Sequence, residues 1–219
     1  MVKSMRKIIA VILIFLGIFL MTYPKLRETY FDYQQRKLLA TWSKTMNDLG
    51  EYSNNDRKAE DYFPAIESKL EKDDYRIQYI NSHMEGVLKI EKIGLSMPIL
   101  TGATKANLDI SAAAVDGTGK PGEVGNYCIS AHRSRTYGRQ FNRLNELEKG
   151  DQIEIINKDT VYRYEVFEKL LVEAKDAWVM FPQKNEKLLT LITCDYSRKP
   201  YPRLVVRAKF LESGEESSD

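Results

Sequence analysis

The hydrophobic and polar positions divide the chain into three parts, and the first is a single apolar run. Residues 8–24 contain no charged side chain, and Lys7 and Lys25 stand on either side of them. A membrane-spanning helix needs about 17–25 mostly apolar residues, so this run predicts a transmembrane signal anchor. A cleaved signal peptide has a shorter apolar region and small residues at its cleavage site, which the residues after Met21 do not provide. Basic residues ahead of the run predict a cytoplasmic N-terminus, with the chain after Pro24 outside the cell.

The second part, residues 25–85, has the composition of helices rather than strands. Apolar residues recur at spacings of three and four between Leu26 and Leu49, and Gly50 marks a helix stop. A polar stretch follows, and then a second, shorter helical pattern begins at Phe63. We expect a helical and flexible stalk that holds the rest of the chain away from the membrane. The alternative is that the second helix packs against the domain that follows.

The third part, from Gly86, alternates between short apolar runs and turn-forming residues. The runs are rich in Val, Ile, Tyr and Thr, and Gly, Pro, Asn and Asp separate them. This pattern predicts a mainly β fold of antiparallel or mixed strands, closed as a barrel or packed as a sandwich. Residues 157–160 predict a hairpin turn, and short helices are expected at 104–113 and 141–151. The predicted strands occupy 86–100, 126–132, 151–157, 160–173, 187–194 and 203–210.

These patterns predict four segments: a cytoplasmic stub and anchor at 1–24, a stalk at 25–85, a β domain at 86–211 and an acidic tail at 212–219. The hydrophobic content of 43% is sufficient for a packed core. The net charge is +2, and basic residues cluster only beside the apolar run. The charge balance therefore offers no electrostatic case for nucleic-acid binding.

The chain has two cysteines and two histidines, so its candidate chemistry is narrow. Cys194 ends the strand-like run TLITC, and three interpretations stay open: core packing, half of a disulfide, or a nucleophile. Cys128 lies four positions before His132, about 13 Å along a strand, so a cysteine that meets His132 is too far from Cys128 to bridge it. His83 precedes the domain and is expected to be structural or exposed. The four residues have no recognisable zinc spacing, and we expect neither a metal nor a cofactor.

A thiol becomes a useful nucleophile only as the thiolate, which needs a base or a positive charge nearby. His132 stands at the end of a predicted strand, on the same strand face as Cys128. Arg203 and Arg207 share one face of the last strand, and an arginine there could donate hydrogen bonds to an oxyanion. The residues alone also allow a buried Cys194 and an ordinary surface histidine.

Three ordered pieces of sequence resemble the sortases, the membrane-anchored cysteine transpeptidases of Gram-positive bacteria. The run TLITC resembles the family's T-L-x-T-C signature and places the catalytic cysteine at Cys194. The run AHR resembles the histidine block and places the catalytic histidine at His132. The run RLVVR resembles the arginine strand and places the catalytic arginine at Arg203, with Arg207 as the second choice.

The resemblance covers the anchor and residues 86–210, and it implies a closed eight-stranded β-barrel. It implies cleavage of an LPXTG- or LPXTA-like sorting signal after its Thr, through a thioacyl-enzyme on Cys194. His132 would protonate the leaving amine and deprotonate the incoming one, and Arg203 would hold substrate and stabilise the oxyanion. Thr193 is a candidate supporting contact to substrate. The implied partners are surface proteins with such a C-terminal signal and an amine of peptidoglycan or its precursor, at the outer face of the cell membrane.

The short link between the cysteine and arginine strands, and the block PGEVGN before the histidine strand, most resemble class D sortases. A single N-terminal anchor and the lack of an Asp-Pro-aromatic lid motif argue against the pilin-polymerising group. Ala131 stands where the family often has Gly. Two other functions are considered: a cell-wall cysteine peptidase that uses water as acceptor, and an anchored binding module without catalysis.

Overall fold

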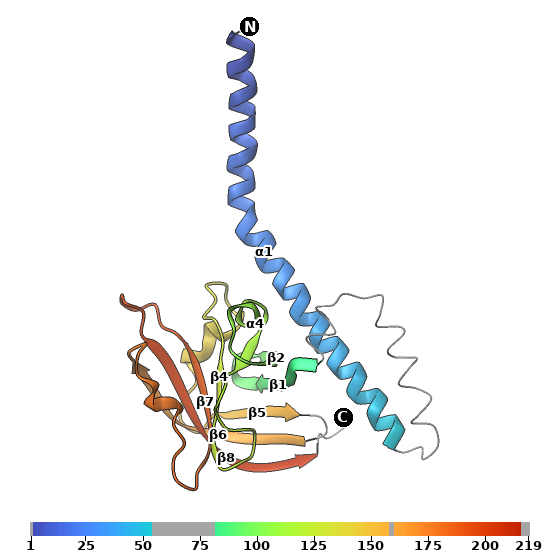
Figure 1. The fold of residues 1–219 in the computed structure, drawn as a ribbon, viewed down its shortest axis with the longest axis vertical. Helices are drawn as coiled ribbons and strands as arrows, with labels where there is room; N and C mark the ends of the chain where they lie inside the picture. The colour runs from blue at the N-terminus through green and yellow to red at the C-terminus, as the bar shows by residue number, and fades with distance from the viewer. Residues whose placement is uncertain (1, 54–81, 158–159, 216–219) are drawn as a thin grey trace.

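A long N-terminal helix lies beside a closed β-barrel in the structure, a computed structural model that describes residues 2–53, 82–157 and 160–215. Helix α1 (Val2–Ser53) joins the predicted anchor and the first predicted stalk helix into one element, with Pro24 inside it. Its N-terminal part projects away from the barrel, and its later part runs alongside (Figure 1). Within the described stretches, no helix combines the length and the apolar composition that crossing a membrane requires. The second predicted stalk helix falls almost entirely outside the described residues.

Eight strands close into a barrel in the order β1-β2-β3-β4-β7-β8-β6-β5. Neighbouring strands are antiparallel, except for the parallel pairs β2–β3 and β4–β7. The predicted mainly β, closed eight-stranded barrel is therefore confirmed. The strands are β1 (Met84–Ile90), β2 (Leu95–Thr101), β3 (Ala112–Ala114), β4 (Gly125–Ser130), β5 (Gln152–Asn157), β6 (Thr160–Val172), β7 (Lys187–Cys194) and β8 (Arg203–Glu215).

The barrel interior is filled by side chains that recur at every second strand position, as the pleat of a strand requires. One buried cluster unites apolar residues from all eight strands and from the short helix after β4. On the strands that matter for the site, the inward residues are Tyr127 and Ile129 on β4, Leu189 and Leu191 on β7, and Leu204 and Val206 on β8. The residues between them therefore point to the outer face of the barrel.

Both short helices expected in the β domain are present. The first, α4 (Lys105–Ile110), begins after Thr104, whose hydroxyl accepts a hydrogen bond from the Asn107 backbone N–H. Such a cap satisfies a donor that the first helical turn leaves free. The second, the 3-10 helix η2 (Phe141–Glu146), buries Phe141 and Leu144 in the core. The predicted hairpin is also present, because Asn157 pairs with Thr160 across β5 and β6.

Other elements differ from the sequence-based expectation. Strand β3 consists of three alanines, and it exists because its backbone pairs with β2 on one side and β4 on the other. The 3-10 helices η1 (Glu91–Ile93) and η3 (Ala177–Met180) were not predicted. Strand β8 runs to Glu215, into the predicted tail, because its end pairs with Thr160 at the start of the long strand β6.

Candidate active site

The three predicted catalytic residues stand at the same end of three neighbouring strands. Cys194 is the last residue of β7 and pairs with Arg203, the first residue of β8. In the parallel pair β4–β7, Ser130 pairs with Ile192, so the same register carried two residues further places His132 level with Cys194. The Ala131 backbone N–H donates to the Ile192 carbonyl at 3.2 Å, which continues the ladder past the end of β4. The register therefore brings His132, Cys194 and Arg203 to one edge of the barrel.

The same three residues share the outer face of the barrel. The inward positions on β7 are Leu189 and Leu191, so Cys194 falls on the outward set. Leu204 is inward on β8, which turns Arg203 outward as well. Strand order and the alternation of inward and outward side chains together place the thiol, the imidazole and the guanidinium on one face.

The two cysteines have different surroundings, and both are free thiols. Cys194 is partly exposed, whereas Cys128 is fully buried. Burial raises the pKa of the Cys128 thiol to about 12, although hydrogen bonds to Thr118 and Thr190 oppose that rise. Cys128 pairs in register with Thr190, four residues before Cys194, or about 13 Å along the strand. Cys128 is therefore a protonated packing residue near neutral pH, too distant to form a disulfide with Cys194.

His132 has a half-exposed side chain and a carboxylate neighbour that sequence reasoning missed. Its Nε2 lies 3.7 Å from Oδ1 of Asp109 on α4. Asp109 also binds Lys105 at 2.9 Å and Arg27 of α1 at 3.5 Å. Partial burial acts to raise the pKa of Asp109, but the Lys105 hydrogen bond and the charges of Lys105, Arg27 and His132 outweigh it and hold that pKa below its usual value. Asp109 is 23 residues from His132 in the chain, and nothing in its local sequence marks it.

The two arginines of β8 differ in burial and in partners. The Arg203 guanidinium is partly exposed, and its Nη1 donates to the Tyr201 carbonyl at 3.0 Å. Arg207 is 4% exposed, binds Glu168 at 2.8 Å and stacks over the Phe167 ring. The first arginine is therefore open to a ligand at the edge that holds Cys194, whereas the second is committed to contacts within the protein.

Thr193 is buried directly beneath the edge that holds the three residues. Its hydroxyl donates to the Ala131 carbonyl at 2.8 Å, next to His132 in the chain. Because this bond joins β7 to the end of β4, it positions the histidine segment relative to Cys194. A contact between Thr193 and substrate stays a prediction.

The loops after β4 and β7 are tied to each other on the same edge. The Arg133 guanidinium binds the Asp195 carboxylate, and the Tyr196 hydroxyl donates to the Arg133 carbonyl at 2.8 Å. Hydrogen bonds from Ser197 and Arg133 hold the pKa of Asp195 below its usual value. These contacts join the residue after His132 to the residue after Cys194. With the Thr193–Ala131 hydrogen bond, the two candidate catalytic segments are therefore connected both before and after His132 and Cys194.

Comparison with known proteins gives one consistent result. The family model described as the Sortase domain matches residues 88–211. The chain is 30% identical over 109 residues to sortase D of Bacillus subtilis, covering 50% of this chain and 53% of that relative. It is 31% identical over 121 residues to sortase A of Bacillus anthracis, covering 55% and 57%. The chain thus spans little more than half the length of these two curated relatives. Among solved structures, the SrtA sortase from Actinomyces oris matches with a TM-score of 0.56 and 32% identity, covering 60% of this chain and 82% of that one.

Proposed function

The chain belongs to the sortase family, and on that premise we propose that it is a cysteine transpeptidase. It would cleave an LPXTG- or LPXTA-like sorting signal after its Thr and transfer the surface protein to a cell-wall amine. The observation that carries the proposal is the placement of His132, Cys194 and Arg203 at one edge of β4, β7 and β8. That trio supplies a nucleophile, a proton carrier and a fixed positive charge, which acyl transfer requires.

Acylation is the first half of the proposed reaction. The Cys194 thiolate attacks the carbonyl carbon of the signal's Thr, a new S–C bond forms, and charge develops on the carbonyl oxygen. Arg203 stands opposite Cys194 on the ladder, and its guanidinium stabilises that oxyanion. The peptide C–N bond then breaks, and the imidazolium of His132 gives its proton to the leaving amine. The products are a thioester on Cys194 and a neutral histidine.

Deacylation runs the same steps with an incoming amine. The amine nitrogen attacks the thioester carbonyl carbon, the N–C bond forms and the C–S bond breaks. One amine proton passes to His132, and Cys194 leaves as the thiolate. The ion pair needed for the next acylation is thereby restored. Thr193 would support both halves by holding the Ala131 segment beside Cys194.

We infer that the chain is a class D sortase and that its sorting signal ends in either Gly or Ala, as LPXTG or LPXTA. The sequence similarity to sortase D of Bacillus subtilis supports this assignment. Sortase A of Bacillus anthracis has nearly the same identity, so the subclass rests mainly on the short link from Cys194 to Arg203 and the PGEVGN block.

Membrane attachment is proposed from the N-terminal part of α1. Large apolar side chains along it are exposed, among them Leu13, Phe15 and Leu20. Basic residues precede the apolar run and Tyr23 stands near its end, an arrangement typical of a helix held in a bilayer with its N-terminus in the cytoplasm. Release of the full chain from membranes by detergent but not by alkaline carbonate is the expected result. Release by carbonate alone would contradict the anchor.

The experiment that tests the proposed function uses an amine as its variable. The full-length chain in detergent is incubated with a sorting-signal peptide, with and without triglycine, and the products are weighed by mass spectrometry. A product joined to triglycine is expected. If the peptide is only hydrolysed, and triglycine never alters the product, the chain is a cysteine peptidase and not a transpeptidase.

A further inference from the structure

The later part of α1 forms one wall of a hollow that opens beside His132. This hollow, called the α1 pocket below, has a volume of about 430 Å³. Its α1 wall includes Arg27, Glu28 and Phe31, and its barrel wall includes Asp109, His132 and Arg135. Residues spaced three or four apart share one face of a helix, so a single face of α1 lines the pocket.

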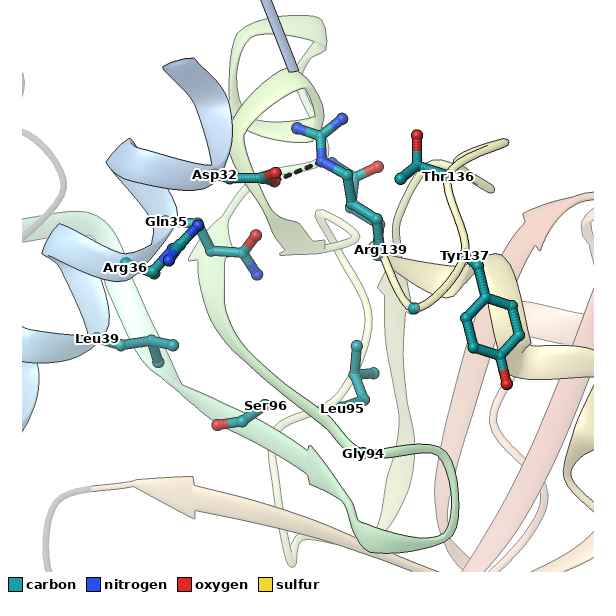
Figure 2. A pocket seen from close by; sticks show the side chains of 12 residues that line it. Asp32, Gln35, Arg36, Leu39, Gly94, Leu95, Ser96, Thr136, Tyr137 and Arg139 are labelled. Carbon is teal, nitrogen blue, oxygen red and sulfur yellow. Dashed lines mark hydrogen bonds and ion pairs between the residues drawn. The ribbon is translucent and has the colours of Figure 1, made fainter. Parts of the chain in front are cut away.

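Contacts on both sides of the α1 pocket hold the helix against the barrel. The Asp32 carboxylate binds Nε of Arg139 at 2.5 Å, and Figure 2 shows the two side chains pointing at each other from α1 and from the loop after β4. Glu28 accepts a hydrogen bond from the Thr136 hydroxyl at 2.9 Å. Further along α1, Leu38 is 2% exposed and packs in a cluster with Leu100 of β2. The wall is therefore a fixed part of the site.

The position of His132 gives the α1 pocket a chemical role. The register places His132 level with Cys194, and the same side chain lines the pocket. An amine that enters from the pocket thus reaches the residue that must take its proton. The Asp109 carboxylate lies 3.7 Å from Nε2 of His132 and places a hydrogen-bond acceptor at the end of the pocket where the neutral amine would arrive.

Arg135 supplies a positive charge in the α1 pocket. Its guanidinium lies over the Tyr196 ring, 5.7 Å from the centroid, on the loop that follows Cys194. Within the described part of the chain it forms no ion pair with a carboxylate, whereas the pocket's Arg27 and Arg139 both do. Arg135 is therefore the pocket's available cation for a ligand anion.

We propose that the α1 pocket is the binding site for the second substrate, and that it selects an amine whose molecule also carries a carboxylate. The amine lies beside Asp109 and His132 in the α1 pocket, and the carboxylate binds Arg135. The inference rests on the proposed transpeptidase function, because it locates the amine that attacks the thioester. The bond changes are those of deacylation: N–C forms, C–S breaks, one proton moves from the amine to His132, and Cys194 leaves as the thiolate.

Two acceptors that differ only in charge test the anion site. Diglycine carries a carboxylate, and diglycinamide has a neutral amide in its place. With the full-length chain in detergent and a fixed sorting peptide, the KM for diglycine should be about three- to fivefold lower than the KM for diglycinamide, the strength of an exposed ion pair. In Arg135→Gln the two KM values should become equal. Arg36→Gln is the matched control, because Arg36 is an exposed arginine of α1 that lines the neighbouring hollow and not the α1 pocket.

The helix wall is tested by Phe31→Ala, with the ratio of aminolysis to hydrolysis as the readout. A fall of about fivefold in that ratio is expected for both acceptors. Equal KM values for the two acceptors in the wild type, an Arg36→Gln effect as large as that of Arg135→Gln, or an unchanged ratio in Phe31→Ala would each overturn the proposal. These failures differ from failure of the proposed function, in which no thioester on Cys194 forms with any acceptor.

Discussion

Cys194 and Arg203 occupy directly paired positions on the antiparallel ladder of β7 and β8, so the thiol and the guanidinium project from adjacent backbone sites. Paired residues on such a ladder have Cβ atoms about 4.5–5.5 Å apart. His132 is level with the same point on the other side of β7. The catalytic edge is therefore a property of strand register, and changes at single positions can test each member separately.

Selective alkylation should distinguish the two cysteines. Cys194 is partly exposed, whereas Cys128 is buried with a thiol pKa of about 12, so only Cys194 should react with iodoacetamide in the folded protein at pH 7.5. Mass analysis should find one label per chain, and two after unfolding in guanidinium chloride. The control Cys194→Ala should stay unlabelled while folded. Rapid labelling of Cys128 in that variant would show that the burial assigned to it is wrong.

The two arginines of β8 should affect different quantities. Arg203→Ala should lower kcat/KM by about 10²–10³, the usual cost of removing an oxyanion donor. Arg207→Ala should change kcat/KM only a few-fold, but it should lower the free energy of unfolding by about 2 kcal/mol, because the hydrogen bond to Glu168 is charge-assisted. Peptide-cleavage kinetics test the effects on kcat/KM, and denaturant unfolding tests the effect on the free energy of unfolding. If Arg207→Ala is the more damaging change to kcat/KM, the assignment of the catalytic arginine to Arg203 is wrong.

Thr193 should act on the histidine segment through its hydrogen bond to Ala131. Thr193→Val removes a buried hydroxyl at nearly constant volume, so we expect a loss of about 1–2 kcal/mol in the free energy of unfolding and a fall in kcat that exceeds any rise in KM. Thr190→Val is a matched control on the same strand, because its hydroxyl bonds Asn126 away from the catalytic edge. Both variants should lose similar stability. An equal loss of kcat in the control would remove the positioning role of Thr193.

Cys128 should make stability depend on pH in the alkaline range. Its pKa is raised from about 8.5 in an unfolded chain to about 12 in the fold, so its contribution is complete below pH 8.5 and declines as pH rises toward 12. Between pH 9 and 10.5 the wild type should lose up to about 1.4 kcal/mol more per pH unit than Cys128→Ala. Tyr127 and Tyr164 also have raised pKa values, but both variants retain them, so the difference isolates the thiol. If the free energy of unfolding in urea falls equally with pH in the wild type and in Cys128→Ala, the raised pKa assigned to the Cys128 thiol is wrong.

The sequence was sufficient for most of the strands and for the faces on which the candidate site residues lie, because both depend on local pattern. Period-two alternation in TLITC and RLVVR predicted the faces on which Cys194 and Arg203 lie. Strand β3 was missed because three alanines have no strand preference of their own, and only its neighbours make it a strand.

The missed parts of the site are contacts between segments far apart in the chain. Asp109 meets His132 because α4 connects β2 to β3, and β3 pairs with β4, the strand that His132 follows. The α1 wall meets the loop after β4 through Asp32 and Arg139. The interpretation of residues 25–85 as a stalk overlooked this docking of α1, because the apolar spacing that buries Leu38 indicates a helix without indicating what the helix packs against. A long-range ion pair leaves no periodic signal in the sequence around either partner.

Trapping the thioacyl-enzyme is the most direct test of Cys194 as the nucleophile. The full-length chain in detergent is mixed briefly with a sorting-signal peptide, quenched in acid, and weighed intact before peptide mapping. We expect a mass increase equal to the acyl group of the peptide fragment that ends at Thr, located on Cys194, released by hydroxylamine and absent from Cys194→Ala. An adduct on Cys128 or on any other residue, or cleavage of the peptide by Cys194→Ala at the wild-type rate, would contradict it.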